Sequence, residues 1–283
     1  MSADRRARDL PLDAHLHTDL SPDSAVPIDD YARQAVERNI AEIAITDHID
    51  FDPSAPAYAF TTFEQRERTV RDAAERWGPR GVAIRFGVEV TWDRRWEADI
   101  RDHLARHAYD FVIGSVHVYR DSVYSAEHVG PWVAAQPSLA DVVAPYFDEV
   151  TAGAGTGLFD AMGHIDFVKR YLVPHVTPDQ LAAAPELYEP ILRALVESGT
   201  ALEVNTSGLR QDAGEPYPSA AIVARFRELG GDRVTVGSDA HRAEHFAWAL
   251  DEGYAAARAA GFRAMTFRRG GATPDIVELP RPV

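Results

Sequence analysis

The sequence predicts an α/β fold in which parallel strands, each followed by a helix, close into a barrel. Short apolar segments that resemble strands alternate with longer amphipathic segments along the chain. About seven such strand–helix units can be traced, and this alternation favours a parallel barrel over an open sheet. The length of 283 residues also suits one barrel, because barrels of about 250 residues are ordinary single domains.

The expected strands are short runs rich in Val, Ile, Leu or Phe that end in polar or turn-forming residues. In chain order they cover residues 14–17, 42–46, 82–90, 111–116, 158–163, 200–204, 233–236 and 264–267.

The expected helices are the segments between these strands, where apolar residues recur at helical spacing among charged ones. They cover residues 28–39, 63–77, 98–107, a segment that ends near residue 153, 184–198, 219–229 and 245–260. The pattern is looser between residues 117 and 146. Residues 153–157 (Gly-Ala-Gly-Thr-Gly) indicate a turn and not a linker. We therefore expect residues 1–283 to form a single domain.

The composition limits the chemistry that the chain can perform. Hydrophobic residues make up 46% of the sequence, which is ordinary for a globular protein with a large core. The chain has no cysteine, so disulfides and thiolate metal ligands are excluded. Any metal ion must be held by histidine nitrogens and carboxylate oxygens.

The charge and the start of the chain bear on partners and location. A formal net charge of -15 argues against nucleic acid as a partner, because non-specific nucleic-acid binding needs basic surface. The first residues are charged and lead into no apolar signal segment, and no apolar run is long enough for a membrane span. We therefore expect a cytoplasmic protein without a membrane partner.

Residues able to bind metal follow six of the expected strands. They are His15 and His17, Asp47 and His48, Glu89, His117, His164, and Asp239 and His241. Parallel barrel strands all point their carboxyl ends to one face, so these residues are expected to converge on one cavity. Two residues apart on a strand, His15 and His17 project to the same side, as two ligands of one ion must.

Each of these clusters also has a structural interpretation when taken alone. Asp47 and His48 can form a turn in which the carboxylate accepts from local backbone N–H groups, and Glu89 can form a surface ion pair with Arg94 or Arg95. Recurrence at six strand ends favours a metal centre. Four other histidines are assigned to helices and loops, namely His103, His107, His128 and His175.

The ordered motifs resemble those of the polymerase and histidinol phosphatase (PHP) superfamily. The matching segments are His15-Leu-His17-Thr18, Thr46-Asp47-His48, Gly87-Val-Glu89, Gly114-Ser-Val-His117, Gly163-His164-Ile-Asp166 and Gly237-Ser-Asp239-Ala-His241. The resemblance covers roughly residues 12–267. It is closest to the histidinol-phosphatase branch, which residues 163–170, 202–210 and 217–219 also resemble.

The resemblance implies a distorted (β/α)7, TIM-like barrel that binds three divalent transition-metal ions (Mn, Fe or Zn). The implied ligands are His15, His17, Glu89 and Asp239 for the first ion, Glu89, His117 and His164 for the second, and Asp23, His48 and His241 for the third. The branch commonly has histidine where this chain has Asp23. An oxygen ligand there favours Mn or Fe over Zn, and Asp19 is the competing candidate.

The resemblance also suggests a mechanism and roles for nearby residues. Metal-ion clusters lower the pKa of bound water and neutralise phosphate oxygens. We expect a hydroxide between the first two ions, with Glu89 bridging them and Asp239 holding the hydroxide proton. Asp239 or His241 would protonate the leaving alkoxide. Asp47 is expected to orient His48 from behind.

A small phosphate monoester also needs cations beyond the metal ions. Arg210, Lys169 and Arg170 follow expected strands and are candidates to bind its oxygens. Lys169 is the only lysine among 29 basic residues. For the cationic part of a substrate such as L-histidinol phosphate, candidates near strand ends are Asp52, Tyr58, Trp92 and Tyr119.

The expected reaction is hydrolysis of L-histidinol phosphate to L-histidinol and inorganic phosphate, a step of histidine biosynthesis. Another PHP phosphoesterase, acting on nucleotides or other monoesters, would share every metal ligand. An amidohydrolase-type hydrolase would need a carboxylated lysine as its metal bridge, and Glu89 is better placed than Lys169. A non-catalytic metal-binding module is the remaining alternative. A homo-oligomer is compatible with the sequence.

Overall fold

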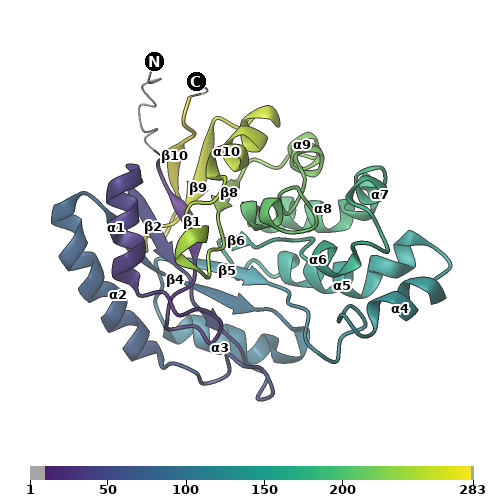
Figure 1. Cartoon of the computed structure of the whole chain (residues 1–283), viewed down its shortest axis with the longest axis horizontal. Helices are drawn as coiled ribbons and strands as arrows, with labels where there is room; N and C mark the ends of the chain where they lie inside the picture. Colours follow the sequence, from purple (N-terminus) through teal and green to yellow (C-terminus); the bar gives the residue numbers. More distant parts are fainter. Residues whose placement is uncertain (1–9, 282–283) are drawn as a thin grey trace.

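Seven parallel strands form the centre of the protein, for which a computed structural model describes residues 10–281. They are β1 (Asp13–Leu16), β2 (Glu42–Ile45), β4 (Ala83–Thr91), β5 (Phe111–Ser115), β6 (Ala161–Met162), β7 (Ala201–Asn205) and β8 (Val234–Gly237). They lie side by side in chain order, and the two-residue strand β3 (His48–Ile49) pairs with β4. The predicted α/β barrel is confirmed (Figure 1).

The barrel closes where β8 meets β1, near the carboxyl ends of both strands. The Asp239 N–H donates to the His15 carbonyl, and the His17 N–H donates to the Ala240 carbonyl, each at 2.9 Å. The buried Asp13 carboxylate completes this seam by accepting from the Ser238 N–H at 2.9 Å and the Ser238 hydroxyl at 2.6 Å. The seam therefore joins the first and last barrel strands through the backbone of three predicted metal ligands, His15, His17 and Asp239.

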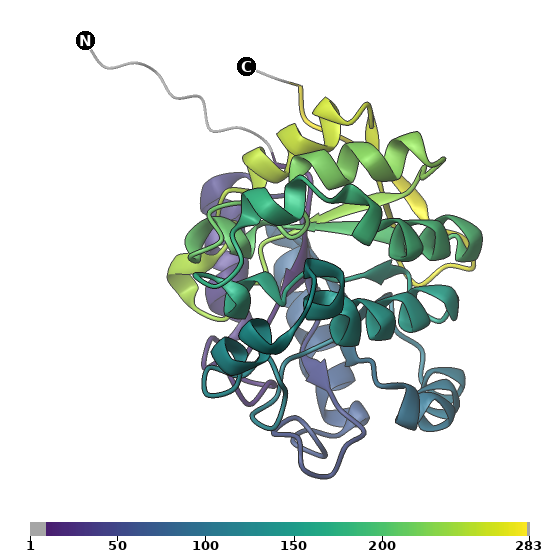
Figure 2. The same cartoon turned by 90° about the vertical axis from the view of Figure 1, so that its right-hand side faces the viewer.

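Ten α-helices surround this sheet in the described part of the chain. They are α1 (Ile28–Arg38), α2 (Phe63–Trp77), α3 (Glu97–Arg106), α4 (Val129–Ala135), α5 (Leu139–Gly155), α6 (Lys169–Leu172), α7 (Pro178–Ala182), α8 (Glu189–Ser198), α9 (Ala220–Glu228) and α10 (Leu250–Ala259). Short 3₁₀ helices are η1 (Gly78–Arg80), η2 (Arg94–Trp96), η3 (Pro185–Leu187), η4 (Thr206–Arg210) and η5 (Ala243–His245). Turned to one side, the molecule shows successive helices stacked over the sheet (Figure 2). Residues 10–281 contain no helix long and apolar enough to cross a bilayer.

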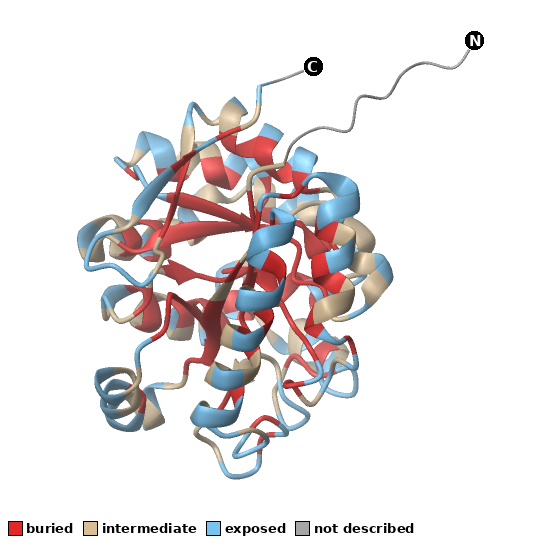
Figure 3. Ribbon diagram, turned by 90° about the vertical axis from the view of Figure 1, so that its left-hand side faces the viewer, coloured by how far each residue is buried: buried red, intermediate tan, exposed pale blue. Residues whose placement is uncertain are grey.

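The helices begin and end where local chemistry requires it. The Thr62 hydroxyl accepts from the Gln65 N–H and caps α2. Helix α1 carries Asp29 and Asp30 in its first turn, where the helix dipole favours negative charge, and ends at Asn39 in a left-handed conformation. Both helices have exposed outer faces and bury their inner faces against the strands (Figure 3).

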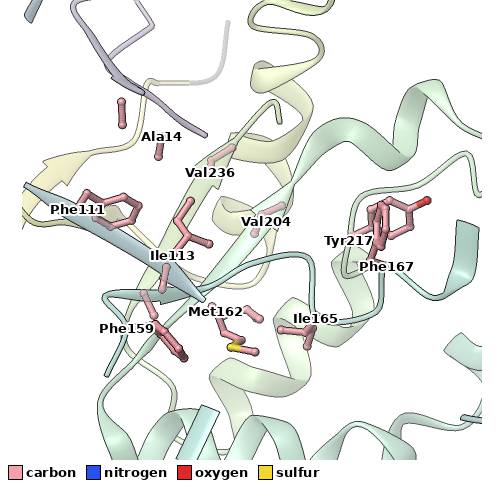
Figure 4. Close-up of a cluster of buried hydrophobic side chains, with 14 of the residues drawn as sticks. Ala14, Phe111, Ile113, Phe159, Met162, Ile165, Phe167, Val204, Tyr217 and Val236 are labelled. Carbon is pink, nitrogen blue, oxygen red and sulfur yellow. The ribbon is translucent and has the colours of Figure 1, made fainter. Parts of the chain in front are cut away.

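Buried apolar side chains cover the face of the barrel sheet that lies beneath the helices. Met162, Val204 and Val236 come from three neighbouring strands, are fully buried and belong to one cluster (Figure 4). A Cβ on Gly253 of α10 would lie 2.7 Å from Val236 and 3.9 Å from Val204, so these side chains face the helices. Side chains alternate along a strand, and the residues on either side of Val204, which are polar, therefore face the barrel interior.

Some predicted elements differ from those observed. The strand at residues 264–267 is β9 (Ala264–Phe267), but it pairs antiparallel with β10 (Asp275–Glu278), outside the barrel sheet. The reason is that the β8–β1 seam leaves no free edge for it. The loose region contains α4 and the start of α5, and the helix expected at 245–260 begins only at Leu250, after Ala247 and Ala249 adopt positive φ.

Candidate metal centre

All nine predicted metal ligands lie at the carboxyl end of the barrel. Their side chains form one connected cluster at the floor of a cavity of about 700 Å³. Strand ends position most of them, and two sit on strained backbone. His164 has a φ of 21° and Asp239 a φ of 52°, a region that costs a non-glycine residue about 1–2 kcal/mol. Such strain is concentrated at functional sites.

The first group contains the two histidines of β1 and its continuation. His15 Nε2 and His17 Nε2 are 3.0 Å apart. They lie 3.5 and 3.4 Å from Glu89 Oε2, and 3.8 and 3.5 Å from Asp239 Oδ1. Four donor atoms from three strand ends therefore point at one volume.

Glu89 lies at the centre of the cluster. Its Oε1 is 3.0 Å from His164 Nε2 and 3.5 Å from His117 Nε2. Its Oε2 is 2.7 Å from His48 Nδ1. The Oε2 atom of Glu89 thus contacts the first group, and its Oε1 atom contacts a second group that contains His117 and His164.

The third group includes the acidic residue about which the sequence left a choice. Asp23 Oδ2 lies 3.2 Å from both His48 Nε2 and His241 Nε2. The competing candidate Asp19 is exposed. The Asp23 side chain is half exposed, so this group is the one most open to the cavity.

The donor set fits divalent cations. Donor atoms of His17, Asp23, His48 and His241 all lie within 4.8 Å of one another, and the same holds for two further groups that contain Glu89. His164 Nδ1 is buried without a hydrogen-bond partner among the described residues, and the contacts of His48 Nδ1 and Glu89 Oε2 are with other ligands of the cluster. Buried polar atoms are rarely left unpaired, so these atoms mark positions where metal ions would bind.

The buried carboxylates of this cluster remain ionised. Burial by itself raises a carboxyl pKa, but His48, His15 and His117 hold the pKa of Glu89 well below its ordinary value. Burial is likewise overcome at Asp239, whose pKa is held low by His15, His17 and His241. The cluster therefore presents anionic oxygens and imidazole nitrogens, which are the ligands expected of Mn, Fe or Zn.

Sequence reasoning missed a buried residue, Glu203, that supports two of the ligands. Glu203 Oε1 lies 2.6 Å from His15 Nδ1, and Glu203 Oε2 accepts from the His164 N–H at 2.9 Å and from the Asn205 side-chain amide at 3.0 Å. The sequence contained an indication of this role, because Glu203 is the only charged residue in the largely apolar strand predicted at residues 200–204.

Replacing Glu203 by glutamine is expected to weaken metal binding by about 10- to 100-fold, since residues that orient a metal-binding histidine commonly contribute that much. Competition with a chromophoric chelator would measure the affinity. The matched control is Glu149→Gln, which removes a carboxylate that pairs with Arg94 at the surface. Equal affinities of Glu203→Gln and wild type would contradict the supporting role.

Asp47 does not orient His48, contrary to the prediction. Its carboxylate accepts from the Thr18 N–H at 2.6 Å and the Thr18 hydroxyl at 2.8 Å. The His48 N–H instead donates to the Ser21 hydroxyl at 2.9 Å. Because β1 and β2 are neighbours, Asp47 reaches across and fixes the chain just after His17.

Two of the three predicted phosphate-binding residues, Arg210 and Arg170, line the cavity. The Arg210 guanidinium donates to the carbonyls of Ser238 at 2.8 Å and Asp239 at 2.6 Å. Lys169 differs, because its Nζ is buried against Asp166 at 2.9 Å and Glu215 at 2.7 Å. Asp166 and Glu215 thus neutralise the charge of Lys169, which does not line the cavity.

Two further residues that line the cavity were not predicted, Arg242 and His245. Both belong to the segment after β8, where Arg242 precedes the helix that was expected at residues 245–260 and His245 is the first residue of that expected helix. Among residues 10–281, no carboxylate pairs with Arg170, Arg210 or Arg242. In a chain with a net charge of -15, these three arginines, here called the arginine wall, place positive charge around one cavity.

The four histidines assigned to structure lie outside the cluster. His103 Nε2 is 2.8 Å from the Tyr109 hydroxyl, and His107 stacks on Phe63. His128 Nδ1 is 2.9 Å from the Ser125 hydroxyl.

A family model described as PHP domain matches residues 13–207. The chain belongs to the PHP domain family. The PHP match includes seven of the nine clustered ligands and also Asp47 and Glu203. Asp239 and His241 lie beyond it, in the last barrel strand and its loop.

Curated relatives of this PHP protein cover nearly its whole length. It is 28% identical over 267 residues to a probable histidinol-phosphatase of Deinococcus radiodurans, covering 90% of this chain and 96% of that one. It is 26% identical over 259 residues to the histidinol-phosphatase of Lactococcus lactis, covering 89% and 91%. A probable phosphatase of Edwardsiella ictaluri is 30% identical over 232 residues, covering 81% and 78%.

The barrel is also that of a solved relative. The crystal structure of histidinol phosphate phosphatase from Lactococcus lactis, complexed with Zn, L-histidinol and phosphate, superposes with a TM-score of 0.80. The match covers 94% of this chain and 98% of that one at 24% identity. At this identity the likeness establishes the fold, a TIM-like PHP barrel.

Proposed function

We propose that this chain is a metal-dependent phosphatase that hydrolyses L-histidinol phosphate to L-histidinol and inorganic phosphate. The observation that carries the proposal is the pairing of two features in one cavity. A cluster of histidines and carboxylates that fits several divalent ions lies beside three arginines that have no carboxylate partner among residues 10–281. The histidinol-phosphatases among its relatives support the substrate.

Three ions would be held by the groups described above, with Glu89 shared between the first two. Bound there, they would supply a lowered pKa for water and positive charge beside the phosphate oxygens. The protein's own contribution is orientation. Glu203 fixes the His15 ring and the His164 backbone. Thr91 Oγ1 lies 3.1 Å from His117 Nδ1. The Nε2 atoms of His15 and His117 are therefore directed at Glu89.

Asp239 and His241 are the proposed proton-handling residues. Asp239 is ionised, and its Oδ2 accepts from the Asn205 amide at 3.3 Å. Its Oδ1, at the cavity, can accept the proton of the attacking water. His241 Nδ1 lies 3.4 Å from that same oxygen, so a proton can pass from one to the other and on to the leaving alkoxide.

The arginine wall would bind the phosphate. The Arg210 guanidinium is held from behind by two backbone carbonyls, which leaves its remaining N–H groups for an anion. Arg170 lies over the Phe167 and Tyr171 rings, and among residues 10–281 no acceptor pairs with its guanidinium N–H groups. Planar guanidinium groups match the geometry of phosphate oxygens.

The cationic end of the substrate would be recognised by Asp50, which lies behind the cavity-lining Tyr119. Asp50 is 9% exposed, and no cation pairs with it among the described residues. The hydroxyl of Tyr119, which lines the cavity, donates to Asp50 Oδ2. The other candidates fit less well, because Asp52 pairs with Arg95 and Trp92 is buried behind the wall. An ammonium or imidazolium group would neutralise Asp50.

Replacing Asp50 by asparagine is expected to reduce kcat/KM for L-histidinol phosphate by about tenfold or more, because an unpaired, partly buried charge would be lost from the binding site. Hydrolysis of p-nitrophenyl phosphate, which carries no cation, should change by less than about twofold. The matched control is Asp52→Asn. Parallel losses on both substrates would contradict a role in recognition.

Release of inorganic phosphate from L-histidinol phosphate tests the function directly. The metal-loaded protein should hydrolyse it with a higher kcat/KM than nucleoside monophosphates and sugar phosphates. A preference for a nucleotide would indicate that this chain is a PHP phosphoesterase with a different substrate. Absence of hydrolysis of every monoester with each of Mn, Fe and Zn would reject a phosphatase.

A further inference from the structure

Lys169 is the only lysine among the 29 basic residues, and it is 1% exposed. A buried ammonium group is unfavourable unless all three of its N–H donors are paired. Every other basic position of the chain holds arginine. The contacts of Lys169 explain why an ammonium group suits this position.

Three acceptors surround the Lys169 ammonium. Asp166 Oδ2 lies at 2.9 Å, Glu215 Oε1 at 2.7 Å and the Pro216 carbonyl at 3.2 Å. The Nζ also lies 5.1 Å from the centre of the Tyr217 ring. A compact ammonium can donate to three acceptors grouped around one atom, whereas a planar guanidinium cannot.

These acceptors come from two segments that follow different barrel strands. Asp166 belongs to the loop between β6 and α6, and Lys169 begins α6 immediately before the cavity-lining Arg170. Asp166 is fully buried and its Oδ2 also accepts from the Tyr188 hydroxyl at 3.0 Å. One side of the ion cluster is therefore anchored in the helical layer.

Glu215 and Pro216 belong to the segment that returns alongside η4, the 3₁₀ helix that ends with Arg210. The backbones of Asn205 and Tyr217 exchange two hydrogen bonds of 2.9 Å. A Cβ on Gly208 would lie 2.1 Å from the Glu215 carbonyl oxygen, so only glycine permits this approach. Movement of Glu215 would therefore be transmitted to η4 and Arg210.

We propose that Lys169 is a positioning residue that joins the Arg170 segment to the Arg210 segment and thereby sets the spacing of the two arginines across a bound phosphate. This proposal rests on the proposed function in that phosphate is taken as the ligand of the arginine wall. Lys169 itself does not touch the substrate. Its ion cluster joins the two loops, which also meet where the Phe167 and Tyr217 rings pack edge to face.

The test is the binding of inorganic phosphate to the metal-loaded protein, measured by isothermal titration calorimetry in wild type, Lys169→Met and Glu215→Gln. Both variants should bind phosphate about tenfold more weakly, because displacement of a binding group by about 1 Å costs that much or more. KM should rise while kcat changes by less than about twofold, and metal content should stay equal.

Arg269→Met is the matched control, since it removes a cation from another buried carboxylate, Glu42, far along the chain. It should leave phosphate binding unchanged even where thermal stability falls. Glu215 is partly exposed, so Glu215→Gln decides the matter if Lys169→Met does not fold.

Phosphate affinity within about twofold of wild type in a folded variant would overturn the proposal, and so would loss of metal together with phosphate. If wild type releases no phosphate from L-histidinol phosphate, the proposed function fails. The phosphate titrations still decide the role of Lys169 in that case.

Discussion

Replacing Glu89 by glutamine is expected to reduce phosphate release by at least about 10³-fold, the largest effect of any single change in this protein. The Glu89 carboxylate contacts five histidines, namely His15, His17, His48, His117 and His164. Glutamine keeps the size of the side chain but removes the charge and turns an NH₂ group toward one of the imidazoles. Two ions that share this carboxylate would then lack a common ligand.

The measurement combines initial rates with metal analysis of the purified Glu89→Gln variant, which should retain fewer ions than wild type. Glu42→Gln is the control. Glu42 is also a buried barrel-strand glutamate, but Arg85 and Arg269 hold it at the beginning of β2, and its replacement should leave the rate intact. Wild-type activity of the Glu89→Gln variant would contradict the role of Glu89 as a ligand shared by two metal ions.

Removal of the metal ions is expected to abolish activity and to destabilise the fold. Ions that bind only the native state stabilise it by about 4 kcal/mol when present at a thousand times their Kd. Dialysis against a chelator should therefore lower Tm, and readdition should restore both Tm and phosphate release. The stability loss has a structural cause, because the buried His164 Nδ1 has no hydrogen-bond partner among the described residues and the Glu89 carboxylate contacts other metal ligands.

Titration of the metal-free protein should reach about three equivalents per chain, since the nine ligands form three groups of three to four. Mn or Fe should support a higher rate than Zn, because Asp23 places an oxygen where an imidazole would favour Zn. Saturation at one equivalent would contradict the three-ion arrangement. Equal rates with all three metals would contradict the predicted effect of Asp23 on metal preference.

The sequence alone was enough for the barrel and for the convergence of the metal ligands. The reason is that both depend on local pattern plus one topological rule. Apolar runs at regular intervals specify parallel strands, and parallel strands in a barrel bring their carboxyl ends to one face. Residues such as His15, Glu89 and Asp239 are thus fixed in space by their place just beyond a strand, however far apart they lie in the chain.

Other features were decided only by the tertiary structure, because they depend on which loops approach one another. Glu203 is recognisable as a charge in an apolar strand, but its contact with His15 exists only because the barrel closes between β8 and β1. Asp47 turned towards Thr18 and not towards His48 for a similar reason, since the neighbouring strand end was closer. Lys169 follows a strand end as Arg170 does, yet the returning segment at Glu215 captures its charge. Strand-end patterns therefore determine where the metal centre lies, whereas loop packing determines which cations remain free to bind a substrate.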